Sequence, residues 1–193
     1  MMGRLRAMRE PLKYVQGRDA TLKFCEEMGY MGKRWLFICS HSGYKACHDK
    51  IEKSFGDKDD YRRYEVFKGI SSYGEIDRMK AIVEEDKIDV VVGVGGGSAV
   101  DTAKATAYYS GTHIVIVPTV AATDAPCTGL SVIYNDDHSF SKYLFYPTNP
   151  DAVMVDTTVI AEAPVRFLIA GMGDALGTYF EGRASIRTES ASL

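Results

Sequence analysis

The stretch Val90–Lys104, which reads VVVGVGGGSAVDTAK, most constrains how this chain folds. It begins as an apolar run of strand length, passes through three consecutive glycines to Ser98, and continues as an amphipathic segment. A glycine turn between a strand and a helix leaves bare N–H groups in front of the positive end of the helix dipole. Glycine also lets a ligand approach the backbone closely. The stretch therefore predicts a strand, a phosphate site and a helix, in that order.

Apolar segments of strand length alternate with amphipathic segments of helix length on both sides of this turn. We expect strands at 13–16, 34–39, 64–67, 90–94, 113–117 and 152–155, and helices at 20–28, 44–55, 75–85 and 99–109. Asp19 is the expected N-cap of the first helix. Such alternation predicts a parallel sheet with right-handed crossovers, and continuous apolar strands fit a sheet covered on both faces. We predict an α/β fold with a doubly wound parallel sheet over residues 11–160.

The pattern changes after Thr128. Short β segments at 131–134 and 142–145 flank the sequence NDDH and predict a hairpin inserted into the domain. From Pro164 the chain is helical, and residues 161–193 are expected to form the first helix of a second, all-helical domain. One helix cannot form a domain, so it either packs on the α/β layer or belongs to a domain that is mostly absent from this chain.

Composition argues against several classes of binding partner and of cellular location. A net charge of -3 gives no electrostatic basis for binding nucleic acid. No apolar stretch reaches the length of about 20 residues that spans a membrane, and no apolar segment of a signal peptide follows the basic N-terminus. The four cysteines lack C-x-x-C spacing, which favours reduced thiols over disulfides or zinc. We expect a cytoplasmic protein.

Ligands of such sheets bind beyond the carboxyl ends of the strands, where the polar loops 40–43, 95–98 and 119–128 are expected. The glycine turn matches a dinucleotide fingerprint weakly, since Ser98 replaces its third glycine. Asp101 and Lys104 lie three positions apart and therefore share a helix face. They form either an ion pair with each other or contacts to a ligand.

Two further carboxylates also have two interpretations each. Asp124 either binds a polyol or forms an Asx turn before Pro126. Asp174, between glycines and apolar residues, is either a metal ligand or an N-cap after a helix break. The four histidines form no i,i+4 pair, and none follows Asp174.

Four motifs in order, GGGSAVDTAK, PTVAATDAPC, NPDAVMVD and AGMGDAL, resemble the glycerol dehydrogenase branch of the iron-containing alcohol dehydrogenase family over residues 11–184. The resemblance implies an α/β dinucleotide-binding domain, then a helical domain, with the active site between them. It implies oxidation of glycerol or a similar polyol, with hydride passing to NAD, and a divalent metal, zinc more than iron.

The resemblance also implies roles for residues. Gly96, Gly97 and Ser98 would hold the pyrophosphate, Asp124 the glycerol, and Asp174 would be the first metal ligand. The remaining cofactor residues would be Ser40, Asp101, Thr119, Ala122, Thr128, Leu130 and Tyr134.

Two departures from the family pattern affect these expectations. Ser40 stands where NAD-using members tend to carry an acidic residue, so NAD stays the first choice and NADP remains open. The family completes its metal site with two histidines downstream of Asp174, and this chain has none there. We therefore expect the chain to bind metal poorly and to turn over little.

Two alternatives to glycerol oxidation follow: a non-catalytic nucleotide-binding fragment, or a related dehydrogenase acting on another polyol. The sequence does not fix the oligomeric state and leaves a homo-oligomer open. An exposed apolar face on residues 164–180 would favour association.

Overall fold

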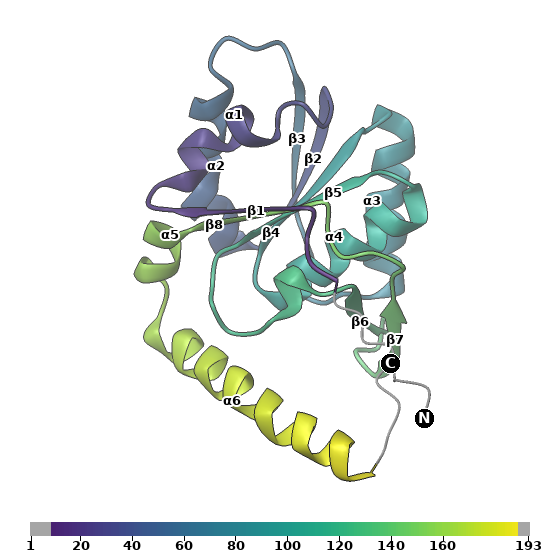
Figure 1. Ribbon diagram of the computed structural model, residues 1–193. Helices are drawn as coiled ribbons and strands as arrows, with labels where there is room; N and C mark the ends of the chain where they lie inside the picture. Colours follow the sequence, from purple (N-terminus) through teal and green to yellow (C-terminus); the bar gives the residue numbers. More distant parts are fainter. Residues whose placement is uncertain (1–8, 189–193) are drawn as a thin grey trace, which may run out of the picture.

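The computed structural model describes residues 9–188 and contains a six-stranded parallel sheet flanked by helices (Figure 1). The strand order is β1-β8-β5-β4-β2-β3. The strands are β1 (Lys13–Gly17), β2 (Arg34–Cys39), β3 (Tyr61–Val66), β4 (Val90–Gly95), β5 (His113–Pro118) and β8 (Ala152–Asp156). The apolar strand that precedes the glycine turn, β4, lies between β5 and β2. The predicted α/β fold with a doubly wound parallel sheet is confirmed.

Alternate side chains of the central strands pack on opposite faces of the sheet. Trp35 and Phe37 of β2 belong to the core cluster that includes Ile51. Leu36 and Ile38 belong to the cluster with Met79. The helices that cover the two faces are α1 (Phe24–Met28), α2 (His41–Phe55), α3 (Tyr73–Asp86) and α4 (Gly97–Ser110). Burial on both faces explains why these strands are continuously apolar.

The predicted helix at 20–28 has the expected bounds, but its first four residues are not α-helical. The structure has a 3-10 helix η1 (Ala20–Lys23) followed by the short α1. Asp19 has a left-handed backbone (φ 53°) and makes no side-chain cap. Its carboxylate lies 3.2 Å from Nζ of Lys50 instead. A tertiary ion pair therefore replaces the local cap that the sequence pattern predicts.

Three helix starts, those of α2, α3 and α4, lie two or three residues before the predicted ones, and one helix was missed. Helix α2 begins at His41, because Oγ of Ser40 accepts a hydrogen bond from the Gly43 N–H at 3.0 Å and caps it. Helix α4 begins at Gly97, inside the glycine run. A short helix, α5 (Thr157–Glu162), was not predicted and is capped by the Asp156 carboxylate.

The inserted hairpin is confirmed as β6 (Leu130–Tyr134) and β7 (Phe140–Phe145), which pair antiparallel. Ile133 of β6 packs with Ile76 of α3 and Ala105 of α4. The 3-10 helix η2 (Ala125–Cys127) precedes the hairpin. The hairpin therefore closes one side of the region beyond the glycine turn.

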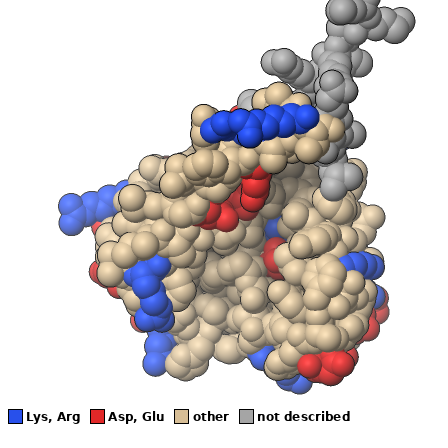
Figure 2. All heavy atoms as spheres, turned by 90° about the horizontal axis from the view of Figure 1, so that it is seen from below, with Lys and Arg blue, Asp and Glu red and all other residues tan. Residues whose placement is uncertain are grey.

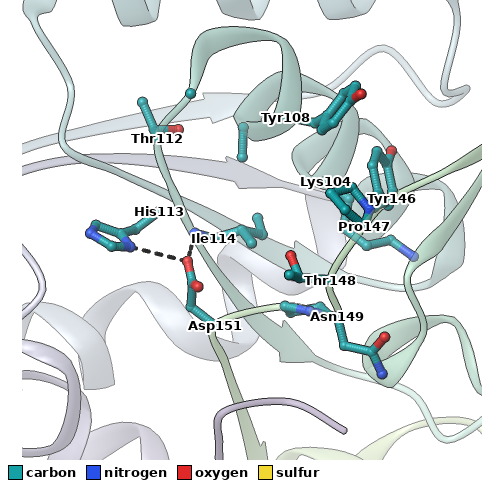
Figure 3. A pocket seen from close by; sticks show the side chains of 13 residues that line it. Lys104, Tyr108, Thr112, His113, Ile114, Tyr146, Pro147, Thr148, Asn149 and Asp151 are labelled. Atoms are coloured by element: carbon teal, nitrogen blue, oxygen red, sulfur yellow. Dashed lines mark hydrogen bonds and ion pairs between the residues drawn. The ribbon is translucent and has the colours of Figure 1, made fainter. Parts of the chain in front are cut away.

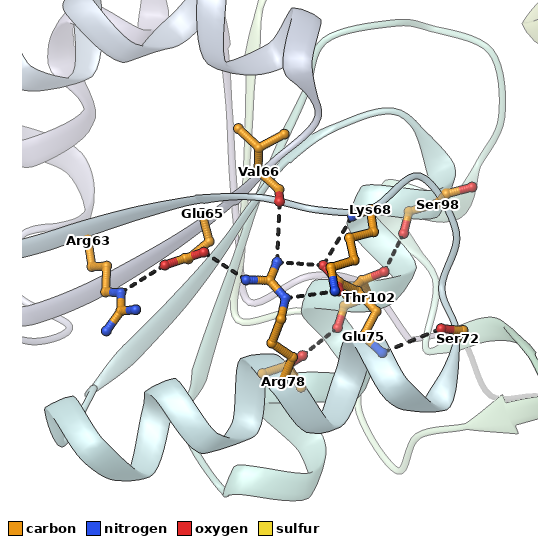
Figure 4. Close-up of polar contacts among 10 residues, drawn as sticks. Arg63, Glu65, Val66, Lys68, Ser72, Glu75, Arg78, Ser98 and Thr102 are labelled. Atoms are coloured by element: carbon orange, nitrogen blue, oxygen red, sulfur yellow. Dashed lines mark hydrogen bonds and ion pairs between the residues drawn. The ribbon is translucent and has the colours of Figure 1, made fainter. Parts of the chain in front are cut away.

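The edge strand β3 is fixed to α3 by alternating charges (Figure 4). Glu65 accepts from Arg63 at 2.9 Å and from Arg78 at 2.8 Å. Arg78 also donates to Glu75 at 2.7 Å, and Glu75 accepts from the Lys68 N–H at 3.1 Å. This network fixes the loop between β3 and α3, and Ser71 lies in that loop.

Helix α6 (Val165–Thr188) extends away from the sheet (Figure 1). It is continuous through Gly171 and Gly173. Its apolar side chains are exposed, and they include Leu168, Ile169, Met172, Leu176, Tyr179 and Phe180. Within residues 9–188, no helix combines the length and apolarity that crossing a membrane requires.

Candidate nucleotide-binding cleft

A cleft of about 250 Å³ opens between α4, the loop after β5 and the hairpin. Figure 2 shows the molecule from below, with a hollow bordered by acidic side chains. The residues that line the cleft are Ser71, Gly97, Ser98, Asp101, Thr123, Asp124, Ala125, Thr128, Leu130, Val132 and Tyr134. Most predicted site residues therefore meet in one cleft at the carboxyl edge of the sheet.

The glycine turn allows α4 to lie close to the sheet. A Cβ on Gly93 would stand 2.7 Å from Cβ of Ala103, and one on Gly95 would stand 2.9 Å from Cβ of Ala99. Gly96 caps α4 with an extended backbone and has no side chain to satisfy the first-turn N–H groups. No side chain of residues 9–188 caps these donors, which stand at the positive end of a 14-residue helix at the cleft wall.

Ser40, Thr119 and Ala122 lie around the cleft without lining it. The Ser40 N–H donates to Val94 O at 2.9 Å, and the Thr119 N–H donates to Gly95 O at 3.0 Å. Both bonds fix the ends of neighbouring strands beside the glycine turn. Ala122 lies next to α6, because its Cα would be 3.4 Å from a Cβ on Gly171.

Asp101 and Lys104 form an ion pair within α4, with Oδ1 and Nζ 3.1 Å apart. The other carboxylate oxygen, Oδ2, accepts from the Val132 N–H at 3.1 Å. Asp101 therefore joins the helix to the hairpin while it lines the cleft. Its contact with a cofactor stays a prediction.

The sequence did not single out Ser71 as a site residue. It is 1% exposed, lines the cleft, and its Oγ has no hydrogen-bond partner within residues 9–188. In the sequence, Ser71 and Ser72 indicate only the start of a helix. Topology brings Ser71 to the cleft, since its carbonyl accepts from the Tyr134 N–H at 2.9 Å.

Asp124 and Asp174 are brought together by the approach of α6. A Cβ on Gly171 would stand 2.1 Å from O of Ala121, so only glycine allows this contact. Asp174 Oδ2 then accepts from the Asp124 N–H at 3.2 Å. The alternative in which Asp174 caps a helix after a break is wrong, because α6 is unbroken there.

The Asp124 carboxylate stands between two hollows. It lines the cleft, and together with Thr123 it also lines a second, mainly apolar cavity of about 430 Å³. Asp124 precedes η2 but makes no side-chain cap to it. Its carboxylate is thus exposed beside the cleft rather than used in a local turn.

No histidine or cysteine of residues 9–188 lines the cleft, although Cys127 lines the second cavity together with Asp124. His113 Nδ1 lies 3.1 Å from Asp151 Oδ2 at the amino ends of β5 and β8, in a different cavity (Figure 3). All four cysteines are free thiols. In the described part of the chain, no three His, Cys, Asp or Glu side chains gather as metal ligands. Asp174 alone does not fit a catalytic zinc site, which uses three protein ligands.

Comparison with known proteins agrees with this geometry. Residues 11–157 match the family described as iron-containing alcohol dehydrogenase. The chain is 42% identical over 188 residues to a glycerol dehydrogenase of Escherichia coli O6:H1 (strain CFT073), covering 97% of this chain and 51% of that protein. It is 44% identical over 181 residues to a glycerol dehydrogenase of Thermotoga maritima, covering 90% of this chain and 47% of that protein.

The crystal structure of glycerol dehydrogenase from Schizosaccharomyces pombe superposes with a TM-score of 0.86 at 37% identity. That match covers 98% of this chain and 48% of the other. The chain thus spans about half the length of the curated relatives it matches. The family match over residues 11–157 and the shared fold lead to one conclusion: the chain belongs to the iron-containing alcohol dehydrogenase family.

Proposed function

We propose that this chain is the nucleotide-binding part of an NAD-dependent glycerol dehydrogenase. The reaction oxidises the secondary hydroxyl of glycerol, or of a similar small polyol, and passes a hydride to the nicotinamide. The observation that carries the proposal is the uncapped first turn of α4, which faces a cleft formed by the predicted residues. The similarity to glycerol dehydrogenases over nearly the whole chain supports the substrate.

The dinucleotide would lie along the cleft with its pyrophosphate at Gly96, Gly97 and Ser98. There the helix dipole and the free N–H groups favour a doubly charged ligand. The remaining contacts would come from Thr119, Ala122, Thr128, Leu130 and Tyr134. Asp124, exposed at the cleft, would accept hydrogen bonds from the glycerol hydroxyls.

Ser40 bears on the choice between NAD and NADP. Its hydroxyl already accepts from the Gly43 N–H, and it brings no charge to the ribose. We propose NAD as the cofactor. We also expect NADP to bind measurably, because no carboxylate at Ser40 repels a 2′-phosphate.

The metal is proposed as zinc rather than iron, with Asp174 as one ligand. Within residues 9–188 no group of three His, Cys, Asp or Glu side chains forms around it, so we assign no catalytic step through the metal. We therefore propose that the 193-residue chain binds nucleotide but turns over little by itself. Its free cysteines favour a reducing, cytoplasmic setting.

Titration with NADH, followed by fluorescence, tests the nucleotide site. A Cβ on Gly97 meets only Thr123 Cγ2, at 3.7 Å, so we expect Gly97→Val to keep the fold and to obstruct the ligand. We expect NADH affinity to fall at least tenfold. Gly182→Val on α6, where a Cβ meets nothing within 4 Å, is the matched control and keeps the parental affinity. Equal affinity in the Gly97 variant and the parent contradicts the proposal.

Turnover is tested separately. The chain is loaded with zinc and assayed for glycerol oxidation with NAD. We expect a rate far below that of a full-length relative, because one carboxylate does not make a zinc site. A comparable rate would overturn the metal assignment and leave the nucleotide site untouched.

A further inference from the structure

Lys104 is a buried lysine that points away from solvent and toward the cleft wall. It is 3% exposed, on the third turn of α4. Its Nζ donates to the carbonyls of Ala125 at 2.9 Å and Thr128 at 3.4 Å, and to that of Leu130. The three N–H groups of the ammonium thus meet three carbonyls of one short segment, 125–130.

Burial of this ammonium requires compensation. Desolvation lowers the pKa of Lys104, and the neighbouring Asp101 carboxylate opposes that shift. Asp101 Oδ1 lies 3.1 Å from Nζ and supplies the opposite charge. Asp101 also accepts from the Val132 N–H, so the pair binds both ends of the segment that leads into β6.

The segment that Lys104 holds forms one wall of the cleft. Ala125, Thr128 and Leu130 line the cleft together with Gly97 and Ser98 of α4. The first three residues of this wall form the short 3-10 helix η2, and from Leu130 the wall belongs to β6, which pairs with β7 and not with the sheet. Bonds to other elements therefore set the distance between the wall and the glycine turn. The bonds from Lys104 do so directly, because Lys104 lies on α4, the helix that begins at the glycine turn.

We propose that Lys104 is a positioning residue of the nucleotide cleft, which with Asp101 fixes the wall 125–132 opposite the Gly97–Ser98 turn. The inference rests on the proposed nucleotide function. The three carbonyls of the wall use the N–H groups of Lys104, so this residue acts on the ligand through the wall. It preorganises the cleft, so that the dinucleotide meets a wall already in place.

The test compares NADH affinity with stability. Lys104→Met keeps an unbranched chain without the ammonium, and we expect NADH affinity to fall at least tenfold. Met79→Ala is the control, because Met79 is fully buried in the cluster between α3 and the sheet. It lowers the Tm without touching the cleft, and we expect its NADH affinity to stay within twofold of the parent.

Chemical rescue separates positioning from general destabilisation. The stem of Lys104 lines the cavity of Figure 3, about 330 Å³, which gives a small amine access to the vacated position. In Lys104→Ala, added propylammonium is expected to restore NADH affinity at least threefold, while uncharged propanol does not. Asp101→Asn is the second variant. When it is combined with Lys104→Met, we expect the loss of NADH affinity to be smaller than the sum of the two single losses.

The outcomes are distinguishable. If the parent chain does not bind NADH, the proposed function fails. If the parent binds NADH and Lys104→Met binds within twofold of it, the positioning role is wrong. The positioning role is also wrong if Met79→Ala and Lys104→Met lower the Tm equally and lose NADH affinity equally. If Lys104→Met does not fold, Asp101→Asn decides, and parental affinity in that variant overturns the inference.

Discussion

Asp156 shows how much one buried carboxylate joins in this protein. It is fully buried at the end of β8. Its Oδ2 accepts from the Thr21 N–H at 3.2 Å and from the Thr21 hydroxyl at 2.5 Å. Its Oδ1 accepts from the Thr158 N–H at 3.0 Å, which caps α5. Burial acts to raise the pKa of Asp156, but the bonds from Thr21 and the charge of Lys50 outweigh it and lower the pKa.

We predict that Asp156→Asn lowers the free energy of unfolding at pH 7 by about 2 kcal/mol, because charged hydrogen bonds and a helix cap are lost. A carboxyl with a lowered folded-state pKa contributes its full stability above its ordinary pKa of 3.8. That contribution is lost as the pH falls from 3.8 toward the folded-state value. The difference between parent and variant in urea unfolding should therefore be largest at neutral pH and shrink below 3.8.

The exposed Asp137 provides the control for that measurement, since within residues 9–188 its side-chain hydrogen bonds go to Ser139 in its own turn. Asp137→Asn should change the free energy of unfolding by less than about 0.5 kcal/mol. A constant difference between Asp156→Asn and the parent across pH 3 to 7 would contradict the assigned linkage.

Single residues were predictable where their partners are close in sequence. The glycine turn could be located because glycines, strand and helix are contiguous. Ser71 and the carbonyl partners of Lys104 could not, because each acts across more than 20 positions that only the folded sheet brings together. Asp19 failed as a cap for the same reason, since its partner Lys50 lies 31 positions away.

At the scale of elements, α6 depends on one glycine for its approach to the sheet. We predict that Gly171→Ala displaces α6 from Ala121, because a Cβ there would overlap the Ala121 carbonyl. The bond from the Asp124 N–H to Asp174 should then open. Hydrogen exchange measures this directly, as faster exchange of the Asp124 amide while the strand amides keep their protection.

Gly173→Ala is the matched control for that experiment, because a Cβ on Gly173 meets nothing within 4 Å. Alanine favours a helix over glycine by about 1 kcal/mol. This variant should leave exchange at Asp124 unchanged or slower. Equal exchange in the two variants would show that Gly171 does not set the position of α6.

The elements themselves were largely predictable from period and length. All six strands of the sheet and the inserted hairpin were expected, because apolar runs and turn residues mark them locally. The helix starts at His41 and Gly97 were misjudged by two or three residues. The short helix α5 was missed because its cap, Asp156, reads in sequence as the end of a strand.

At the scale of the whole molecule, the exposed face of α6 is the main unpartnered apolar surface in residues 9–188. Leu168, Ile169 and Leu176 are 50%, 62% and 61% exposed. Exposed apolar patches of this kind promote association. We predict that the chain self-associates at micromolar concentrations, and that Ile169→Glu with Leu176→Glu shifts it toward monomer in sedimentation velocity.

The control carries an equal charge change elsewhere. Leu12 before β1 and Tyr30 after α1 are 85% and 72% exposed, and Leu12→Glu with Tyr30→Glu should leave the sedimentation profile unchanged. If the α6 double variant sediments like the parent, association does not depend on this face. The expectation of a helix starting near Pro164 was correct, but the sequence alone did not decide whether the α/β layer covers it.

The pairing of β1 with β8 also governs how the chain matures during synthesis. Lys13 lies opposite Ala152, 139 positions later. At about 5–20 residues per second, a ribosome needs roughly 7–28 s to make the intervening polypeptide. For that time the first strand has no neighbour, while β2, β3 and β4 can already pair. Folding of the sheet would therefore be completed last at the edge that β1 and β8 form.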